Sequence, residues 1–370
     1  MDNGARHEFY GKHRQIASFL ERRGLDAVLL GTRANFAWAT GGCDNHVVQG
    51  TEDGFAQLLV SRDRAYVLTT NIEMPRLEDE ELKGLDVEAL ATPWHAEDVL
   101  ATVRNLSFDI ERVHSDMPSL GLMSLTNDFD RLRYQLTSVE QTRYRELGRA
   151  VRDVVEEICG EIQPGWTEYD VAGEVDGALV ASGLIPSVVL VGSDERAYRY
   201  RHPIPKDKPI ERYVMVVVCA RRYGLVANLT RCVHFGEPPS ELRERFDAVT
   251  EVDARIIEAT RVGRPVADIF NRCIGAYREL GYADEWQRHH QGGATGYVER
   301  EYLATPDIDE SVLDGQAFAW NPSIQGSKSE DTVLVTEDGV EFITEPGPGW
   351  PRDVHTVEGT GIARPGLLVR

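Results

Sequence analysis

Histidines stand out among the side chains that could do chemistry in the C-terminal half of the chain. His202 lies directly before a Pro-Ile-Pro turn, and His289 and His290 are adjacent in the segment RHHQGGATGYVEREY. A histidine whose pKa is near neutrality can take a proton from water and return it to a leaving nitrogen, as cleavage of a C–N bond requires. His202 is therefore a candidate general base and acid. The alternative is that its ring caps the turn.

Charged and amide side chains accompany these histidines in the same blocks of sequence. We expect Glu330 and His290 to join His202 in catalysis. We expect the substrate to be held by Arg231, Asn228, Asn321, His289, Arg300, Glu301 and Tyr297. Two of these residues have structural alternatives, since Arg231 can pair with a core carboxylate and Glu330 can anchor a backbone turn. If the segment with the adjacent histidines is a strand, their rings point to opposite faces and at most one faces a cleft.

The elements that must position these residues fall into two domains. A chain of 370 residues is too long for one compact core and short for three. Near the N-terminus an amphipathic stretch ends at Gly24, and apolar runs follow at residues 27–30, 55–60 and 65–69. This alternation predicts a small α/β domain, which we place at residues 1–137. The second domain then occupies residues 138–370.

The second domain is predicted to begin with a long helix and to contain a weak internal repeat. Ser138 followed by Gln141 has the spacing of a capping box, and Pro164 with Gly165 should end the helix. A shift of 98 positions superposes Gly165 on Gly263, Asp170 on Asp268, Gly177 on Gly275, Ala178 on Ala276 and Gly183 on Gly281. The matches arise either by chance or from a duplicated α+β unit. Duplication would place two sheets around a central cleft, with a binding site between the halves.

The composition restricts the partners and the location of the protein. Hydrophobic residues make up 42% of the chain and charged residues 27%, as in ordinary globular proteins. The net charge of -21, with no basic stripe, opposes nucleic acid and membrane surfaces as partners. Charges throughout the first thirty residues argue against a signal peptide, so we expect a cytoplasmic location. The five scattered cysteines argue against a disulfide framework and a structural zinc site.

The order of these blocks resembles that of the creatinase, prolidase and methionine aminopeptidase superfamily, the pita-bread hydrolases. In that superfamily a histidine in an HxxP-like turn precedes two strands, each of which supplies an aspartate to a pair of divalent metals. The second strand reads approximately DxTRT, and residues 228–231 of this chain read Asn-Leu-Thr-Arg. The resemblance covers residues 140–345. It implies an α/β N-terminal domain, an α+β pita-bread domain with an internal pseudo-twofold duplication, and a homodimer.

Most positions that match the metal ligands of this superfamily carry other residues. The first aspartate position falls between Val217 and Cys219, and Asn228 replaces the second aspartate. Asn321 stands where the resemblance implies a glutamate as fourth ligand, and only Glu330 matches the fifth. Because a pair of divalent cations needs several anionic oxygens, we predict that the dinuclear centre is absent and that no metal or cofactor is required.

The third ligand position depends on the alignment of one block. Matching the glycines puts Gly293 at this position and Arg300 where the superfamily has a second catalytic histidine. A short gap instead lets His289 or His290 fill the ligand position. A single softer metal held by Cys219, Glu330 and a histidine is the alternative to a metal-free site.

Three functions are compatible with this sequence. The leading hypothesis is a metal-independent hydrolase or lyase that cleaves a C–N or related bond of a small polar nitrogen-containing molecule or short peptide, with His202 as general base and acid. The resemblance implies this role, because His202 stands at the position that matches the catalytic histidine of creatinase, which works without a metal. The second hypothesis is a non-catalytic pita-bread module that binds a peptide or protein. The third is a metallopeptidase-like enzyme with an altered metal ligand set, and no motif identifies the substrate.

Overall fold

The computed structural model describes residues 3–370 and divides into two compact units. The first unit extends to Arg133 and includes the short segment 223–225, and the second comprises residues 134–222 and 226–370. Among the described residues, no helix is both long enough and apolar enough to cross a membrane.

The N-terminal unit is the expected α/β domain, built on a mixed sheet of six strands in the order β4-β3-β2-β1-β5-β6. The first helix ends at Arg23, and the chain reverses through Gly24 with a φ of 66°, which glycine adopts without a steric penalty. The three apolar runs predicted from sequence are strands β1 to β3. The elements are α1 (Asn3–Arg23), β1 (Ala27–Thr32), α2 (Arg33–Thr40), β2 (Asp53–Ser61), β3 (Ala65–Thr70), α3 (Met74–Arg76), β4 (Glu88–Thr92), α4 (Val99–Asn105), β5 (Val113–Ser115), β6 (Met123–Ser124) and α5 (Asn127–Asp130).

The C-terminal unit consists of two similar halves, each with two helices followed by antiparallel strands. The bounds of the second helix in each half are 98 residues apart, the same shift as in the sequence repeat. The first half contains α6 (Ser138–Glu161), α7 (Glu168–Ala181), β7 (Ile185–Ser193), α8 (Glu195–Arg199), β8 (Tyr213–Arg222) and β9 (Leu225–His234). The second half contains α9 (Ser240–Ala259), α10 (Val266–Glu279), η6 (Glu285–Arg288), β10 (Gly292–Thr295), β11 (Tyr302–Leu303), β12 (Gln316–Trp320), β13 (Ser323–Ile324), β14 (Ser327–Lys328), β15 (Asp331–Thr336), β16 (Gly339–Phe342), β17 (Arg352–Val357), β18 (Thr360–Pro365) and β19 (Leu368–Val369).

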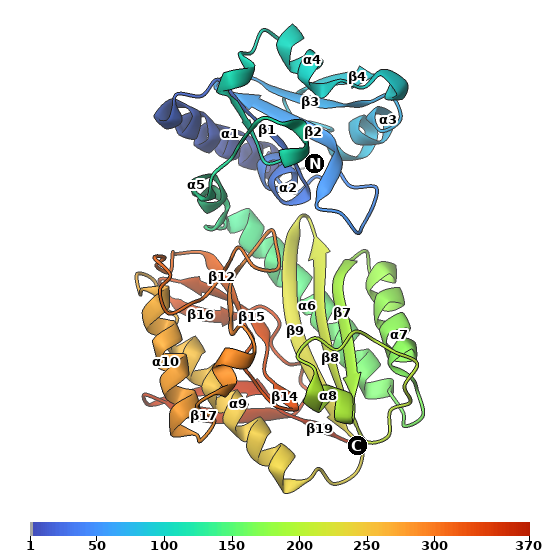
Figure 1. Ribbon diagram of the computed structural model, residues 1–370, viewed down its shortest axis with the longest axis vertical. Helices are drawn as coiled ribbons and strands as arrows, with labels where there is room; N and C mark the ends of the chain where they lie inside the picture. The colour runs from blue at the N-terminus through green and yellow to red at the C-terminus, as the bar shows by residue number, and fades with distance from the viewer. Residues whose placement is uncertain (1–2) are drawn as a thin grey trace. The chain divides into compact units, whose positions relative to one another are not determined.

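Two sheets of this unit position the candidate functional residues, which lie on β9 or in connections next to the strands. One has the strand order β19-β9-β8-β7 and the other β11-β10-β12-β15-β16. Figure 1 shows α6 and α7 beside the first sheet and α9 and α10 beside the second, so each pair of helices covers its own sheet. The register of β7 on β8 places Val188 opposite Cys219 and Leu190 opposite Val217. These apolar side chains line one wall of the pocket described below.

The capping box of the long helix α6 starts one residue earlier than the sequence analysis predicts. Thr137 is the N-cap, and its hydroxyl oxygen accepts a hydrogen bond from the backbone N–H of Glu140. In return, the backbone N–H of Thr137 donates to the carboxylate of Glu140. The predicted pair, Ser138 with Gln141, lies one position too far along the chain. Both pairs have the same spacing, and only the geometry of the backbone distinguishes them.

Candidate active site

The turn that carries His202 is held against strand β7 by a glycine. An added Cβ at Gly192 would lie 2.5 Å from Cγ of Pro203, so a larger residue there would displace the turn. His202 is exposed, and it precedes Pro203 in a loop without helix or strand between α8 and β8. The close approach of strand and turn therefore fixes the position of the His202 backbone.

The adjacent histidines lie between η6 and β10, in a segment that is not a strand. Gln291 holds this segment, since its side-chain amide donates to the carbonyl oxygen of His289 and its Oε1 accepts from the hydroxyl of Tyr277 at 2.7 Å. Both rings lie near His202, with ring centroids 5.0 Å away for His289 and 5.9 Å for His290. Because the segment is not a strand, the condition under which the two rings would point to opposite faces does not apply. Although both rings lie near His202, of the two only His290 lines the pocket described below.

These three residues form what we call the histidine cluster: His202, His289 and His290. One ligand-type atom from each lies within 4.8 Å of the others, and Nε2 of His289 is 3.1 Å from Nε2 of His202. Nδ1 of His290 is buried and has no hydrogen-bond partner among the described residues. Imidazoles this close together, from two separate segments, can share a proton or share an ion.

Burial and nearby cations keep the histidine cluster neutral at pH 7. Desolvation, and after it the charge of Lys328, lowers the pKa of His289 to about 2. Desolvation and the charge of Arg300 lower the pKa of His290 to about 4, and desolvation with Lys328 lowers the pKa of His202. Neutral imidazole is the form that accepts a proton or donates a lone pair to a metal.

Glu330 lies beside the cluster, but both of its carboxylate oxygens are already used. Oε2 is 2.7 Å from Nζ of Lys328 and accepts a hydrogen bond from the hydroxyl of Thr230 at 2.7 Å. Oε1 accepts from the guanidinium of Arg300 at 2.9 Å. Burial raises the pKa of Glu330, but the charges of Lys328 and Arg300 outweigh it and hold that pKa at about 2. Glu330 therefore anchors two cations.

Lys328 is a charged site residue that sequence analysis missed. Its side chain is buried, with 4% exposed, and it pairs with Glu330. The two residues are separated by one position, the spacing that puts side chains on the same face of an extended segment. That spacing in the segment GSKSED was the available signal.

Asn228 and Asn321, which stand at positions that match metal ligands of the superfamily, differ in their hydrogen bonds. The Nδ2 group of Asn228 donates to the hydroxyl of Thr295 at 3.1 Å, and its Oδ1 accepts from Arg300 at 3.2 Å. Asn321 is 2% exposed, and within the described chain its Oδ1 has no hydrogen-bond partner. Nε of Arg300 is also buried without a partner there. Buried polar atoms in native proteins are nearly always paired, so these atoms indicate a missing polar ligand or water.

A pocket of about 350 Å³ brings most of these residues together. One wall is apolar and is formed by side chains from β7, β8 and the turn after His202. The polar end contains two members of the histidine cluster and the two cations. The lining residues are Val188, Leu190, His202, Ile204, Val217, Cys219, His290, Glu299, Arg300, Asn321, Lys328 and Glu330.

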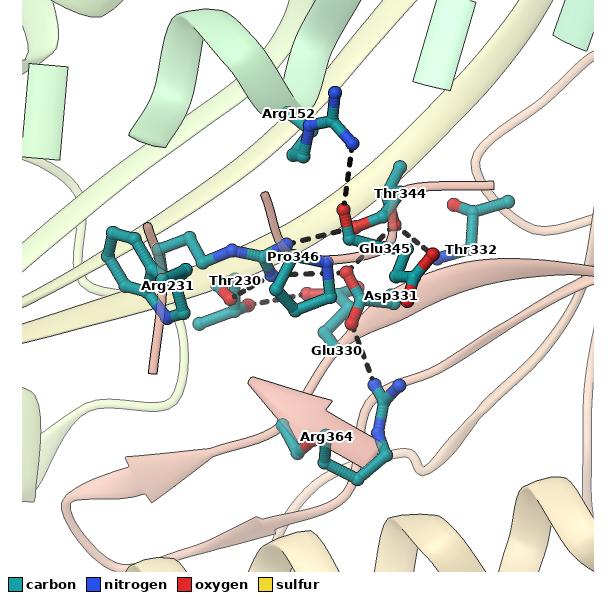
Figure 2. Close-up of polar contacts among 12 residues, drawn as sticks. Arg152, Thr230, Arg231, Glu330, Asp331, Thr332, Thr344, Glu345, Pro346 and Arg364 are labelled. Carbon is teal, nitrogen blue, oxygen red and sulfur yellow. Dashed lines mark hydrogen bonds and ion pairs between the residues drawn. The ribbon is translucent and has the colours of Figure 1, made fainter. Parts of the chain in front are cut away.

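Arg231 does not reach this pocket. Its side chain is fully buried, with Nε 2.7 Å from Glu156 and Nη1 3.1 Å from Asp331. Figure 2 shows Arg231 and Arg364 approaching Asp331 from two directions, and the second pair is 2.9 Å apart. The expectation that Arg231 binds substrate is therefore not supported, and its alternative role, pairing with a core carboxylate, describes what is seen.

Tyr297 and Glu301 are also outside the pocket lining. Tyr297 is fully buried, and its hydroxyl donates to Oε1 of Glu140 at 2.6 Å. Oε1 of Glu301 accepts from the backbone N–H of Tyr297 at 3.0 Å. Both side chains stabilise the connection after β10, which corrects their predicted role in substrate binding.

The residues at the former ligand positions do not fit a carboxylate-bridged metal pair. Gly293 has no side chain, and an added Cβ would lie 2.1 Å from the carbonyl oxygen of Tyr302, so close strand pairing excludes any other residue there. Cys219 is buried on β8, and burial raises the pKa of its thiol, which disfavours the thiolate that a metal needs. Of the described residues, only the histidine cluster forms a compact group of possible metal ligands.

Comparisons with known proteins agree with this architecture. Residues 142–337 match metallopeptidase family M24, and residues 12–154 match the creatinase/prolidase N-terminal domain. An uncharacterized peptidase of Staphylococcus haemolyticus is 23% identical over 90% of this chain and 98% of its own length. One of Staphylococcus aureus is 25% identical over 61% of this chain and 66% of its own length.

Solved structures share the fold over nearly the whole chain. A Xaa-Pro dipeptidase from Bacillus anthracis has a TM-score of 0.78 and 19% identity, covering 98% of this chain and 100% of its own. A prolidase from Pyrococcus horikoshii has a TM-score of 0.77 and 18% identity, and the match covers 92% of this chain and 99% of the prolidase chain. The N-terminal domain of FACT complex subunit SPT16 from Cicer arietinum has a TM-score of 0.72 and 12% identity, covering 92% and 97%.

Proposed function

The chain belongs to metallopeptidase family M24, and on that basis we propose that it is a peptidase-type hydrolase that cleaves a C–N bond in its C-terminal pocket without a dinuclear metal centre. The proposed substrate is a short peptide or another small polar nitrogen-containing molecule. The observation that carries the proposal is the histidine cluster at one end of a pocket whose polar atoms are only partly bonded.

The bonding of Glu330 supports the absence of the metal pair. Its two oxygens are bonded to Lys328, Arg300 and Thr230, so each oxygen already has a cationic partner where a bridging carboxylate would bind metal ions. The ammonium group of Lys328 and the guanidinium group of Arg300 stabilise the negative charge of this carboxylate. Divalent ions would make the same electrostatic contribution. A buried carboxylate with two cationic partners is stable in this arrangement, whereas adding cations would bring like charges together.

The pocket contains groups for each part of a hydrolytic reaction. His202, neutral at pH 7, accepts a proton from water as the water oxygen bonds to the carbonyl carbon. It then gives that proton to the nitrogen as the C–N bond breaks. Asn321 and Arg300 line the pocket, and each has a buried polar atom without a partner among the described residues. In this proposal Oδ1 of Asn321 accepts a substrate N–H and Nε of Arg300 donates to a substrate oxygen. Val188, Leu190 and Ile204 would contact the apolar part of the substrate.

A substrate screen with the full-length protein tests this proposal. Guanidino, amidino and X-Pro compounds would be incubated with the wild-type protein and with His202→Ala. We expect hydrolysis of at least one class, with turnover about 10²–10⁴-fold lower in the variant, as is usual when a general base is lost. His95→Ala, which removes an exposed histidine from the N-terminal unit, is the matched control and should keep wild-type turnover.

Two results of the screen would decide against the proposal. Equal turnover in wild-type protein and His202→Ala would remove the histidine cluster from the chemistry. Binding of peptides without hydrolysis of any compound would favour the non-catalytic module. The SPT16 domain, which shares the fold, makes that alternative worth measuring.

Metal independence remains a separate question within the proposal. Membership of a metallopeptidase family favours an enzyme with an altered ligand set over one that uses no metal. The histidine cluster is the specific observation that favours this second candidate. His202 as a metal-free general base, the leading hypothesis from sequence, remains a prediction that metal analysis would decide.

Two further expectations from sequence also remain predictions. The homodimer would be checked by sedimentation of the full-length protein. The division into residues 1–137 and 138–370 would be checked by limited proteolysis, with cleavage expected near that boundary.

A further inference from the structure

We infer that the histidine cluster, His202, His289 and His290, binds a single transition-metal ion. Its ligand atoms come from two segments that are far apart in sequence, and they lie within 4.8 Å of one another. This site differs from the carboxylate-bridged pair that the resemblance implies, because its donors are nitrogen atoms and because it holds one ion. The inference goes beyond the proposed hydrolase activity and does not depend on it. With the ion bound His202 is a ligand, so its general-base role applies to the metal-free protein.

The geometry of the cluster suits one ion with nitrogen ligands. Two ligands at zinc–nitrogen distances of about 2.0–2.1 Å in a tetrahedral site lie roughly 3.3 Å apart. Nε2 of His289 and Nε2 of His202 are 3.1 Å apart, close to that separation. His290 follows directly, its ring centroid 4.3 Å from that of His289. Only small side-chain adjustments are therefore needed to direct three imidazoles at one point.

Surrounding groups orient these rings. Oγ of Ser323 lies 3.4 Å from Nδ1 of His289, on the side of the ring away from His202, where a metal-bound histidine usually has a polar partner. Gln291 fixes the backbone of His289 through its hydrogen bond to the carbonyl oxygen. Nδ1 of His290 is buried with no partner in the described part of the chain. A buried nitrogen left unbonded in this position is the observation that points to a ligand.

The charges around the pocket indicate which metal would bind. Lys328 and Arg300 oppose a hard cation held mainly by electrostatic attraction, and Glu330 offsets only part of their charge. Imidazole nitrogens bind zinc, cobalt, nickel and copper through directional donation, whereas magnesium and calcium prefer oxygen. Three protein ligands would leave one position open for water or for an anionic group of a substrate, as in catalytic zinc sites.

The test is a metal titration of the untagged full-length protein after removal of metals with a chelator. Co²⁺ would be added while the visible absorption bands of the bound ion are recorded, and Zn²⁺ would then be added as a competitor. We expect one Co²⁺ per chain and displacement by Zn²⁺. Loss of a residue that only hydrogen-bonds to a metal ligand costs about 10–100-fold in metal affinity. Because His289→Ala removes a ligand itself, it should weaken binding by at least about 100-fold.

Control variants keep the result interpretable. His95→Ala removes one exposed histidine outside the pocket and should bind as tightly as the wild type. His290→Gln is a second cluster variant, used with circular dichroism of the metal-free proteins to show that loss of binding is not loss of fold. Absence of Co²⁺ bands in the wild-type protein, or unchanged binding in both cluster variants, would overturn the inference.

Activity measurements separate this inference from the proposed function. Hydrolysis by metal-free protein that does not rise when Zn²⁺ or Co²⁺ is restored would keep the hydrolase proposal and reject any catalytic role for the ion. One Co²⁺ bound through the cluster, with no hydrolysis of any screened compound, would keep the metal site and reject the hydrolase.

Discussion

Two polar clusters lie next to each other at the start of strand β15, and they are built in different ways. Neighbouring residues of a strand point to opposite faces, so Glu330 and Asp331 belong to different surroundings. Glu330 lies with Lys328 and Arg300 at the pocket. Asp331 lies between the guanidinium groups of Arg231 and Arg364 in the interior, as Figure 2 shows.

The two clusters differ in how their polar atoms are bonded, and this difference assigns a structural role to the cluster of Asp331 and a functional role to the cluster of Glu330. Arg231 and Asp331 are fully buried and bonded to charged or polar partners on several sides. The pocket instead keeps buried polar atoms of Asn321, Arg300 and His290 without partners among the described residues. The interior network joins the halves of the domain, although Nη1 of Arg364 and Oδ1 of Asp253 also have no partner among the described residues. The unpaired atoms of the pocket differ because their residues line a cavity that a ligand would fill.

The largest expected effect is on stability, from breaking the interior network. Asp331→Ala would leave Arg231 and Arg364 without this carboxylate in a fully buried position. Removing one partner of a buried ion pair costs about 3–5 kcal/mol, so the free energy of unfolding measured in urea should fall by that amount.

An exposed ion pair provides the matched control for this measurement. Glu341→Gln breaks the pair with Arg145, whose side chains are 45% and 33% exposed, and it should change stability by less than about 1 kcal/mol. Equal effects of the two substitutions would show that the interior network is not the stabilising cluster.

An intermediate effect should appear in the pH dependence of stability. Lys328 and Arg300 hold the pKa of Glu330 at about 2, below its ordinary value of 4.5. The carboxylate therefore contributes stability that is present above pH 4.5 and is lost as the pH falls toward 2. At about 1.4 kcal/mol per pKa unit, the contribution is about 3 kcal/mol.

Glu330→Gln isolates this contribution from other groups that titrate in acid. Urea unfolding at pH 5, 4 and 3 should show a shallower loss of stability in the variant than in the wild type. Parallel curves would mean that Glu330 is not ionised against the two cations as the structure indicates.

The smallest effect on stability is expected at the pocket itself. Oδ1 of Asn321 is bonded to no other described residue, so Asn321→Ala removes no hydrogen bond through this atom and should change the free energy of unfolding by less than about 1 kcal/mol. If a substrate N–H bonds to this oxygen, its KM should rise by about 5–10-fold, the worth of one neutral hydrogen bond. A large loss of stability without a change in KM would assign Asn321 to the structural cluster.

Much of the fold could be predicted from sequence because local patterns determined it. Apolar runs bounded by turn residues predicted the strands, and the repeat at a shift of 98 positions predicted the duplicated halves. The capping box was placed one residue late because Thr137 with Glu140 and Ser138 with Gln141 have equivalent spacing. The family resemblance, now shown, came from the order of motif blocks rather than from any single residue.

The site was harder to predict, because the direction in which a side chain points depends on contacts between segments far apart in the sequence. Arg231 lies in a motif next to the pocket, yet strand alternation turns it toward Asp331. A strand would point His289 and His290 to opposite faces, but the segment is irregular and both rings approach His202. Lys328 went unnoticed because a lysine near a carboxylate in sequence is usually exposed, and only the tertiary structure shows its burial.

The number of divalent ions bound per chain tests the central claim most directly. Untagged protein saturated with Co²⁺ and freed of excess ion would be analysed by mass spectrometry of the metal and by protein concentration. The absence of a metal pair predicts no more than one ion per chain, and the histidine cluster predicts that this ion is lost in His289→Ala. Two ions per chain, retained in that variant, would contradict the account.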